Sequence, residues 1–555
     1  MAGKTGRYKV IEQLLADGMT YMFGNPGTVE QGFLDAMGDY PAMKYILTLQ
    51  ESIAVMIADG YARCTQRPTL VQLHSTPGIG NAVGALYQAK RGHSPLVVIA
   101  GDAGLSYLNM DAQMAGDLVA FMEPVTKYAT MVTDSRSVLR TLRRAIRIAA
   151  TPPMGPVYVC LPMDVLDEVN NEEVFPTLIP DTRVLPRAGV IEAAAEALLK
   201  GQTPMIFVGD GVAYSNANDE LTRVAELLGA EVYAADIGDV VMDTTHPLYK
   251  GTTGHMTGSY SLPITRKAES VLIVGTYMLP EVFPELGDIF SPGTRVVHFD
   301  LNAYEIGKNH RVDIAAVSDP KLSLAALADE LQRRISPQYR AEADKRMAIS
   351  GQLKADKHKA EIEADKKTMY KPAPVEMPAL AVMLAEKLPK DAIIFDEALT
   401  ASPALTRYLP PRAPGSYFVT RGGSLGIGIP GAIGAKLAHP ERTVIGFSGD
   451  GGSMYTIQAL YTAARYNIGA KFVICNNGTY RLLNLNIDQY WKERDIKDRP
   501  LPVAFDLSKP NIRFDRLACA MGVRADLVDN PFFLGHPVDV MLGDDNPFLL
   551  DIVMP

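Results

Sequence analysis

The residues best placed to do chemistry lie in two short segments toward the C-terminus. Gly449-Asp450-Gly451-Gly452-Ser453 follows one apolar stretch and Asn476-Asn477 follows the next, with a helical pattern between them. A glycine-rich turn at a helix start favours a phosphate, because free N–H groups and the helix dipole face it. Asp450 and Asn477 supply hard oxygen ligands of the kind that Mg²⁺ prefers. The two segments together predict a divalent cation that joins the protein to a diphosphate.

Two further candidate groups lie near the N-terminus. Glu51 follows the apolar stretch Tyr45–Leu49 and opens a helical pattern. A carboxylate at this place is usually only a favourable partner of the helix dipole, but beside a cofactor it can act in acid–base catalysis. His74 follows the stretch Thr69–Leu73. Imidazole can donate or accept a proton at neutral pH, although a structural role for His74 stays open.

Together these segments resemble the thiamine diphosphate (ThDP)-dependent enzymes over essentially the whole chain. The resemblance is strongest to benzoylformate decarboxylases and other 2-oxo acid decarboxylases, with some acetolactate synthase-like features. The segments that carry it are Gly24-Asn25-Pro26-Gly27-Thr28-Val29-Glu30, Leu49-Gln50-Glu51, Ala58-Asp59-Gly60-Tyr61-Ala62, Leu73-His74-Ser75, Gly80-Asn81, Gly422-Gly423-Ser424-Leu425-Gly426, Ile429-Pro430 and Asn476-Asn477-Gly478-Thr479-Tyr480.

The resemblance implies a role for each matching residue. Glu51, His74 and Thr28 would be catalytic, with Glu51 bonded to the aminopyrimidine ring so that the C2 ylid can form. Asp450, Asn477 and the backbone oxygen of Thr479 would bind Mg²⁺. The implied cofactor-binding residues are Asn25, Pro26, Leu399, Thr400, Gly423, Leu425, Asp450, Gly451, Gly452, Ser453, Asn477, Thr479 and Tyr480. The expected substrate pocket consists of Met278, Leu279, Val282, Phe283, Leu482 and Leu485.

The implied reaction is decarboxylation of an apolar 2-oxo acid, aromatic ones included, through an enamine intermediate. One departure weakens this prediction: the segment 276–283, where the decarboxylases carry a second active-site histidine near position 282, contains none. Glu281 or His255 could substitute for it. The alternative is a ThDP-dependent carboligase or C–C lyase, either acetolactate synthase-like or acting on an acyloin or 2-hydroxyacyl substrate. A relative that only binds its cofactor is a third hypothesis, which intact Glu51, Asp450 and Asn477 disfavour.

The elements that must position these groups alternate between strands and helices, which is typical of an α/β protein with parallel sheets. The predicted strands are Thr20–Phe23, Tyr45–Leu49, Thr69–Leu73, Leu96–Ala100, Met205–Val208, Glu231–Ala235, Val271–Gly275, Arg295–Asp300, Ala392–Phe395, Thr443–Phe447 and Lys471–Cys475. The predicted helices are Tyr8–Ala16, Glu51–Arg63, Ile79–Lys90 and Met454–Tyr466.

The fold class that we expect is α/β, with three doubly wound parallel-sheet domains. An N-terminal pyrimidine-binding domain is predicted at 1–185, a middle domain at 186–345, a partly helical linker at 346–372 and a diphosphate-binding domain at 373–555. Acetolactate synthases keep FAD in their middle domain. The turn Gly209-Asp210-Gly211 therefore leaves FAD open here, beside the simpler interpretation of a plain turn.

The amino-acid composition and net charge limit the kinds of binding partner that the protein is expected to have. The 555 residues are 47% hydrophobic and 21% charged, and the net charge is −9. This excludes global disorder and argues against nucleic acid or an anionic membrane as the main partner. Without an apolar run of about 20 residues or a signal-peptide pattern, the chain is predicted to be cytoplasmic. The resemblance further implies a small-molecule substrate and a homodimer with active sites at its interface, commonly paired into a homotetramer.

Overall fold

The computed structural model describes residues 3–278 and 280–555. Within this part of the chain the strands form three six-stranded sheets with parallel pairing, which confirms the predicted α/β fold class. The chain divides into two compact units. One contains residues up to Pro180 with Met369–Tyr408 and Thr420–Pro555, and the other contains Asp181–Thr368 and Leu409–Val419. Each of the three predicted domains holds one sheet, and their boundaries stay predictions.

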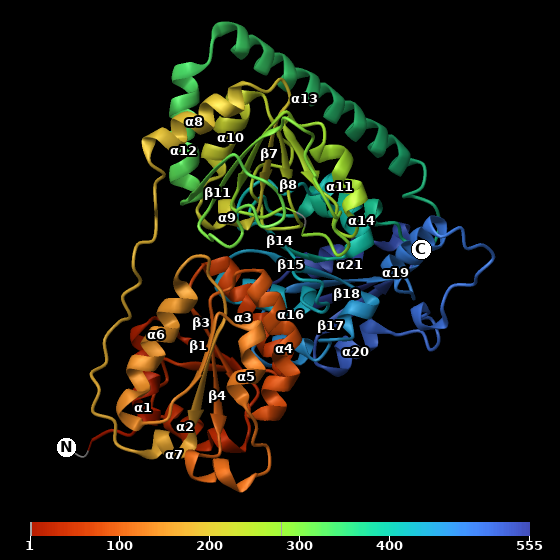
Figure 1. Ribbon diagram of the computed structural model, residues 1–555. Helices are drawn as coiled ribbons and strands as arrows, with labels where there is room; N and C mark the ends of the chain where they lie inside the picture. The colour runs from red at the N-terminus through yellow and green to blue at the C-terminus, as the bar shows by residue number, and fades with distance from the viewer. Residues whose placement is uncertain (1–2, 279) are drawn as a thin grey trace. The chain divides into compact units, whose positions relative to one another are not determined.

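The first sheet has the strand order β2-β1-β3-β4-β6-β5. Its strands are β1 (Tyr21–Gly24), β2 (Lys44–Leu47), β3 (Thr69–Leu73), β4 (Leu96–Asp102), β5 (Tyr128–Met131) and β6 (Val157–Pro162). The helices are α1 (Gly6–Ala16), α2 (Gln31–Met37), α3 (Glu51–Thr65), α4 (Thr76–Arg91), α5 (Leu118–Met122), α6 (Val138–Ala150) and α7 (Met163–Asp167). Apolar side chains of α1 and α6 pack on one face, and α3 and α4 cover the other (Figure 1).

The middle sheet has the order β12-β11-β10-β7-β8-β9. Its strands are β7 (Pro204–Val208), β8 (Glu231–Ala234), β9 (Tyr249–Thr252), β10 (Ser270–Val274), β11 (Arg295–Asp300) and β12 (Ile314–Val317). The helices are α8 (Ala188–Leu199), α9 (Asp210–Tyr214), α10 (Asn218–Leu228), α11 (Gly258–Thr265), α12 (Pro320–Arg334) and α13 (Pro337–Lys366). Side chains of α8, α10 and α12 bury one face of the sheet in a continuous apolar core.

Helix α13 runs through most of the predicted linker and is fastened to the middle unit by three polar side chains. Arg346 donates from Nη2 to the carbonyl oxygen of Leu228 at 2.7 Å. Ser350 donates to the Pro247 carbonyl at 2.8 Å, and Lys354 Nζ donates to the Tyr249 carbonyl at 2.8 Å. This segment is therefore part of the middle unit's structure up to Lys366.

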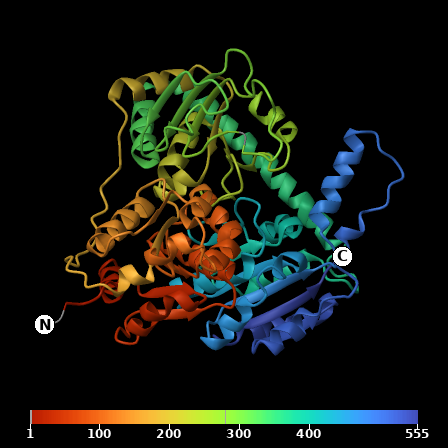
Figure 2. The same ribbon diagram turned by 60° about the horizontal axis from the view of Figure 1, so that its bottom comes forward.

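The third sheet has the order β14-β13-β15-β16-β18-β17. Its strands are β13 (Ile393–Glu397), β14 (Tyr417–Val419), β15 (Val444–Gly449), β16 (Lys471–Asn476), β17 (Arg524–Val528) and β18 (Phe548–Val553). The helices are α14 (Met377–Lys387), α15 (Ser402–Tyr408), α16 (Gly428–Ala438), α17 (Asp450–Ser453), α18 (Ala459–Arg465), α19 (Arg481–Glu493), α20 (Phe514–Ala520) and α21 (Gly535–Leu542). Figure 2 shows α19 and the loop after it projecting from the rest of the C-terminal part (blue).

Within the first unit, α3 and α16 touch backbone to backbone. A Cβ added at Gly60 would lie 2.3 Å from the Gly431 carbonyl oxygen, and one added at Gly434 would lie 2.0 Å from the Ile57 carbonyl oxygen. Real Cβ atoms do not come so close, so only glycine fits at these positions. The contact joins the N-terminal sheet, through the helix that begins at Glu51, to the C-terminal sheet that carries Asp450.

The predicted elements agree with the observed ones, apart from small shifts at their ends and one clear difference. Strands β3 and β11 have the predicted bounds. The helix predicted over Met454–Tyr466 is wrong at its start, since α18 begins only at Ala459. The residues before it form turns, in which the Thr456 hydroxyl donates to the Gly426 carbonyl at 2.6 Å. This long-range contact outweighs the local helical preference.

Candidate active site

Glu51 is the first residue of α3 and lies buried at the carboxyl edge of the N-terminal sheet. The helix starts here because the Gln50 side chain accepts hydrogen bonds from the backbone N–H groups of Ser52 and Ile53. The Glu51 carboxylate accepts from Asn25 Nδ2 at 3.0 Å and from Asn81 Nδ2 at 2.9 Å. Two amides from separate segments thus hold the carboxylate in place. No role for Asn81 was predicted from the sequence.

His74 follows β3 and is paired with a buried carboxylate that the sequence analysis did not single out. Its Nδ1 lies 3.0 Å from Glu30 Oε2. Glu30 also accepts from the Gly27 N–H at 3.1 Å and from the Gly101 N–H at 3.0 Å. Burial raises the pKa of Glu30, and its hydrogen bonds with His74 and the two N–H groups oppose that rise. The pair fixes which imidazole nitrogen faces Glu30 and leaves Nε2 for other partners.

Two glycines let these groups approach one another. A Cβ at Gly27 would lie 1.9 Å from His74 Nδ1, so the imidazole packs directly on the backbone of the Gly24–Glu30 loop. A Cβ at Gly78 would lie 2.8 Å from His74 Cβ and 3.5 Å from Glu51 Oε1. Glu51 and His74 therefore flank the same glycine, which places two candidate acid–base groups side by side.

Two other residues of the Gly24–Glu30 loop were predicted to belong to the site, and both are exposed. Pro26 and Thr28 are exposed, and Thr28 is the first residue of the short 3-10 helix η1 (Thr28–Glu30). The Thr28 hydroxyl thus sits two residues before the carboxylate that binds His74. This arrangement suits a contact with a molecule outside the protein core.

In the C-terminal part, Glu397 organises the segments that were predicted to bind the cofactor. It is the last residue of β13, is buried, and accepts from the N–H of Gly426, from the Gly428 N–H at 2.8 Å and from Ser448 Oγ at 3.1 Å. Burial raises its pKa to about 7, and nearby Asp396 adds to the rise. Sequence analysis missed Glu397, although an acidic residue at the end of an apolar strand is a signal that could have indicated it.

The residues next to Glu397 include an unusual backbone conformation. Leu399 lies in the 3-10 helix η5 (Leu399–Ala401) and has a φ of 49°. A left-handed leucine is uncommon and costs energy unless its surroundings hold it there. Leu399 and Thr400 are half-buried beside the Glu397 anchor, so strain is concentrated in a segment predicted to bind the cofactor.

The turn that carries the predicted cofactor-binding residues Gly423 and Leu425 is held from both sides. Gly423 is exposed and has a φ of 74°, and Leu425 is half-buried. Thr420 Oγ1 donates to the Ser424 carbonyl at 2.6 Å, and Gly426 is bonded by Glu397 through its N–H and by Thr456 through its carbonyl. The backbone here is fixed while its apolar side chain stays partly open.

Asp450 and the Asn477–Thr479 segment meet at the ends of the neighbouring strands β15 and β16. Asp450 is buried and accepts from the Gly451 N–H at 2.8 Å and from the Gly478 N–H at 2.7 Å. Burial raises its pKa, against the effect of these N–H groups. Asn477 Oδ1 accepts from the Thr479 N–H at 3.1 Å. Carboxylate, amide and carbonyl oxygens therefore lie in one neighbourhood, a donor set that fits Mg²⁺.

Neighbouring residues shape the same edge. Ser453 Oγ donates to the Gly449 carbonyl at 2.7 Å. A Cβ at Gly451 would lie 2.2 Å from the Tyr480 ring, so the ring packs on this glycine, and a Cβ at Gly452 would approach Glu397 Oε1 to 3.3 Å. The glycines at 451 and 452 thus leave backbone surface where the motif predicts a diphosphate. No cluster of three or more His, Cys, Asp or Glu side chains suited to a metal occurs in the described residues.

The predicted pocket residues occupy different surroundings. Met278 is buried and packs in the core of the middle sheet with Phe207 and Phe290. Val282 and Phe283 are exposed, and so is Leu485 on α19, where Leu482 is half-buried. Leu279 lies outside the described residues.

The two candidate substitutes for the missing histidine lie together in the middle unit. His255 Nδ1 is 3.2 Å from Asp236 Oδ1. This hydrogen bond is the main cause of a raised pKa for His255. Glu281 is buried and accepts a hydrogen bond from Ser261 Oγ. Backbone bonds from Val282 to His255 and from Phe283 to Met256 join the two segments.

Comparison with known proteins identifies the family to which the chain belongs. Three family descriptions match the chain: "Thiamine pyrophosphate enzyme, N-terminal TPP binding domain" at residues 4–121, "central domain" at 191–327 and "C-terminal TPP binding domain" at 400–552. The chain belongs to the thiamine pyrophosphate enzyme family. Strands β1–β4 and β14–β17 lie in regions that match TPP-binding domains, which supports thiamine diphosphate as the cofactor.

Relatives within the family have two kinds of activity. Benzoylformate decarboxylase from Pseudomonas aeruginosa is 30% identical, and the alignment covers 99% of this chain and 98% of that protein. The acetolactate synthase large subunit from Lactococcus lactis is 28% identical over 99% of this chain and 92% of its own. A thiamine diphosphate-dependent 4-hydroxybenzoylformate decarboxylase from Rhodococcus jostii superimposes with a TM-score of 0.84 at 28% identity, covering 99% of both chains.

This thiamine pyrophosphate enzyme is thus related to benzoylformate decarboxylases and to acetolactate synthases. None of its described helices is both long enough and apolar enough to cross a membrane.

Proposed function

We propose that this protein decarboxylates apolar 2-oxo acids, aromatic ones included, with thiamine diphosphate and Mg²⁺. The observation that carries the proposal is the placement of Glu51 and His74 on either side of Gly78. A carboxylate and an imidazole at one sheet edge provide acid–base groups of the kind that such a reaction requires. Similarity to a benzoylformate decarboxylase over 99% of the chain supports the same conclusion.

When bound, thiamine diphosphate supplies a nucleophilic carbon that attacks a carbonyl group and accepts the electrons released with CO₂. Asn25 and Asn81 hold Glu51, which would bind a ring nitrogen of the aminopyrimidine. This contact would favour proton transfer by the aminopyrimidine. Asp450, Asn477 and the Thr479 carbonyl would bind Mg²⁺. The other proposed cofactor contacts are Pro26, Leu399, Thr400, Gly423, Leu425, Gly451, Gly452, Ser453 and Tyr480.

His74 would move protons at the substrate. Its Nδ1 is engaged by Glu30, so Nε2 is the atom available to exchange a proton with the reacting group. The Thr28 hydroxyl would donate a hydrogen bond to the substrate carboxylate. The proposed apolar substrate contacts, which would exclude water and favour loss of CO₂, are Leu279, Val282, Phe283, Leu482 and Leu485. Met278 is left out, because it is buried in the core of the middle sheet.

A second candidate function is carbon–carbon bond formation or cleavage, acting on a second 2-oxo acid, an acyloin or a 2-hydroxyacyl substrate. It is supported by the lack of a histidine in the segment 276–283 and by the similarity to acetolactate synthases. Without a second proton donor, protonation of the decarboxylated product would be slow. A second carbonyl compound could then react first.

We also propose a homodimer with its active sites at the subunit interface, paired into a homotetramer, and a cytoplasmic location. The family relationship supports the assembly. FAD is not part of the proposal.

The deciding experiment supplies the purified protein with Mg²⁺, thiamine diphosphate and a panel of acids: benzoylformate, phenylpyruvate, branched 2-oxo acids and pyruvate. Each acid is tested with and without an acceptor aldehyde, while CO₂ and organic products are measured together. Release of CO₂ with an equal amount of free aldehyde supports the decarboxylase. Release of CO₂ mainly with the acceptor, as a hydroxyketone, favours the carboligase, and no CO₂ from any acid would overturn decarboxylation.

A further inference from the structure

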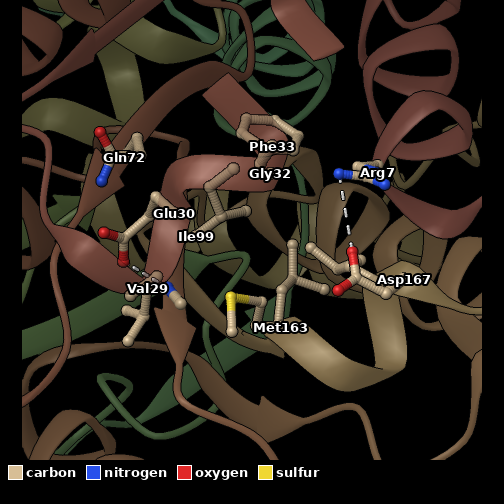
Figure 3. A pocket seen from close by; sticks show the side chains of 13 residues that line it. Arg7, Val29, Glu30, Gly32, Phe33, Gln72, Ile99, Met163 and Asp167 are labelled. Atoms are coloured by element: carbon tan, nitrogen blue, oxygen red, sulfur yellow. Dashed lines mark hydrogen bonds and ion pairs between the residues drawn. The ribbon is translucent and has the colours of Figure 1, made fainter. Parts of the chain in front are cut away.

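A small pocket lies behind the Glu30–His74 pair, inside the N-terminal part of the chain. Its volume is about 20 Å³, and its lining includes Glu30, Gln72, Ile99 and Met163 (Figure 3). Arg7 and Asp167, an ion pair at 3.7 Å, lie on the side of the pocket away from Glu30, and Asp167 is exposed. A cavity of roughly 10–15 Å³ is enough for one water if polar groups are there to bind it. The pocket therefore has room for about one molecule.

Gln72 lines this pocket and carries a polar atom that has no hydrogen-bond partner among the described residues. The residue is 1% exposed, and its Oε1 accepts from the Tyr45 hydroxyl at 2.6 Å. Among the described residues no group accepts a hydrogen bond from its Nε2. Figure 3 shows this nitrogen on the side of Gln72 that faces the Glu30 carboxylate. A buried amide nitrogen without a partner is destabilising, and a bound water would satisfy it.

Glu30 has the capacity to be the second partner. Its Oε1 accepts one hydrogen bond from protein, from the Gly101 N–H, whereas Oε2 accepts from Gly27 and faces His74. A carboxylate oxygen can accept two hydrogen bonds. Oε1 is therefore able to accept one more, from a donor in the pocket.

We propose that one buried water bridges Gln72 Nε2 and Glu30 Oε1, which makes Gln72 a positioning residue for His74. The connected groups then run from the Tyr45 hydroxyl through Gln72 and the water to Glu30 and His74. A hydrogen bond to a carboxylate is charge-assisted and stronger than a neutral one. The water keeps Glu30 ionised and correctly turned toward His74. The catalytic part of this inference rests on the proposed function, while the water and its two partners do not.

The surroundings of Glu30 determine what a pH experiment can detect. Besides His74, the titratable groups that sense its charge are Tyr45, Tyr158 and Cys160, and burial raises the pKa of all three, to about 12 for Cys160. The Arg7–Asp167 pair is the other charged lining of the pocket. None of the three raised groups ionises near neutrality, so a change of the pH profile in that range does not come from them.

The test compares Gln72→Leu, which removes the amide at similar volume, with the matched control Met163→Leu in the lining of the same pocket. Loss of one donor raises the pKa of Glu30, so the acid limb of kcat/KM should move upward by roughly 0.5–1 pH unit, and kcat/KM should fall about 3–10-fold. Met163→Leu should leave both unchanged. Tyr45→Phe should give a smaller shift in the same direction.

A crystal structure of the unmodified protein tests the water directly. The expected result is one water within hydrogen-bond distance of the Gln72 amide and the Glu30 carboxylate, absent from Gln72→Leu. An empty pocket, or the same kinetics in the Gln72 and Met163 variants, would overturn the inference. If no 2-oxo acid is a substrate, the proposed function fails by itself, and the crystallographic result still decides whether the water is present.

Discussion

Replacing Glu397 by glutamine should separate cofactor binding from the stability of the protein. The carboxylate is 1% exposed and receives hydrogen bonds from Gly426, Gly428 and Ser448. Its pKa of about 7, against 4.5 for a free glutamate, corresponds to a cost on the order of 3 kcal/mol for keeping the charge buried, at about 1.36 kcal/mol per pH unit. Ionisation of Glu397 above about pH 7 therefore lowers the stability of the protein.

Glutamine removes that cost but introduces another. Its single oxygen can replace one acceptor, and its NH₂ group then faces a backbone N–H of Gly426 or Gly428, which costs about 1–3 kcal/mol. The two effects nearly cancel, so the free energy of unfolding without cofactor at pH 8 should change by less than about 2 kcal/mol. The backbone that carries Gly423 and Leu425 loses one of its anchors. We expect the Kd for thiamine diphosphate to rise about tenfold or more, since tenfold corresponds to about 1.4 kcal/mol.

The pH dependence provides an independent check. Because burial raises the pKa of Glu397, its contribution to stability is complete below about pH 4.5 and is lost as pH rises through about 7. Glu397→Gln should abolish this part of the pH dependence. Calorimetric titration of thiamine diphosphate with Mg²⁺ and thermal unfolding at pH 6 and 8 measure both effects. Glu386→Gln, an exposed residue of α14, is the matched control. Wild-type cofactor affinity in Glu397→Gln would refute the reasoning.

Three further predictions concern the candidate acid–base and metal groups. Glu51→Gln should lower kcat by about 10²–10⁴-fold, the scale of lost general acid–base catalysis, with an unchanged circular dichroism spectrum; turnover at the wild-type rate would remove Glu51 from the mechanism. Asp450→Asn should raise the Mg²⁺ concentration needed for half-maximal cofactor binding by at least about tenfold, because a charged ligand is lost, and cofactor binding that resists EDTA would contradict the metal site. Burial raises the pKa of Glu30, so activity that depends on the ionised Glu30 carboxylate should be lost on acidification. Glu30→Gln should remove this step from the kcat/KM profile, whereas an unchanged profile would assign the step to another group.

The structure shows how far local sequence patterns could be trusted. Strands such as Thr69–Leu73 and Arg295–Asp300 were predicted with their observed bounds, because short, mostly apolar segments are typical of strands buried on both faces. The helix predicted from Met454 failed at its start, because Thr456 bonds to Gly426. Local propensity could not anticipate that contact.

The sequence by itself indicated the fold class and the family, and it identified Glu51, His74 and Asp450 as candidate functional residues. These conclusions depend on short contiguous segments, in which apolar spacing and glycine-rich turns are visible along the chain. Only the tertiary structure decided which hydrogen-bond partners fix the site. Glu30 pairs with His74, Asn81 donates to Glu51, and Glu397 accepts from the N–H of Gly426. These partners come from separate strands and loops. Parallel packing brings the carboxyl ends of such elements to one edge, and burial then makes each unpaired polar atom costly enough to require a partner.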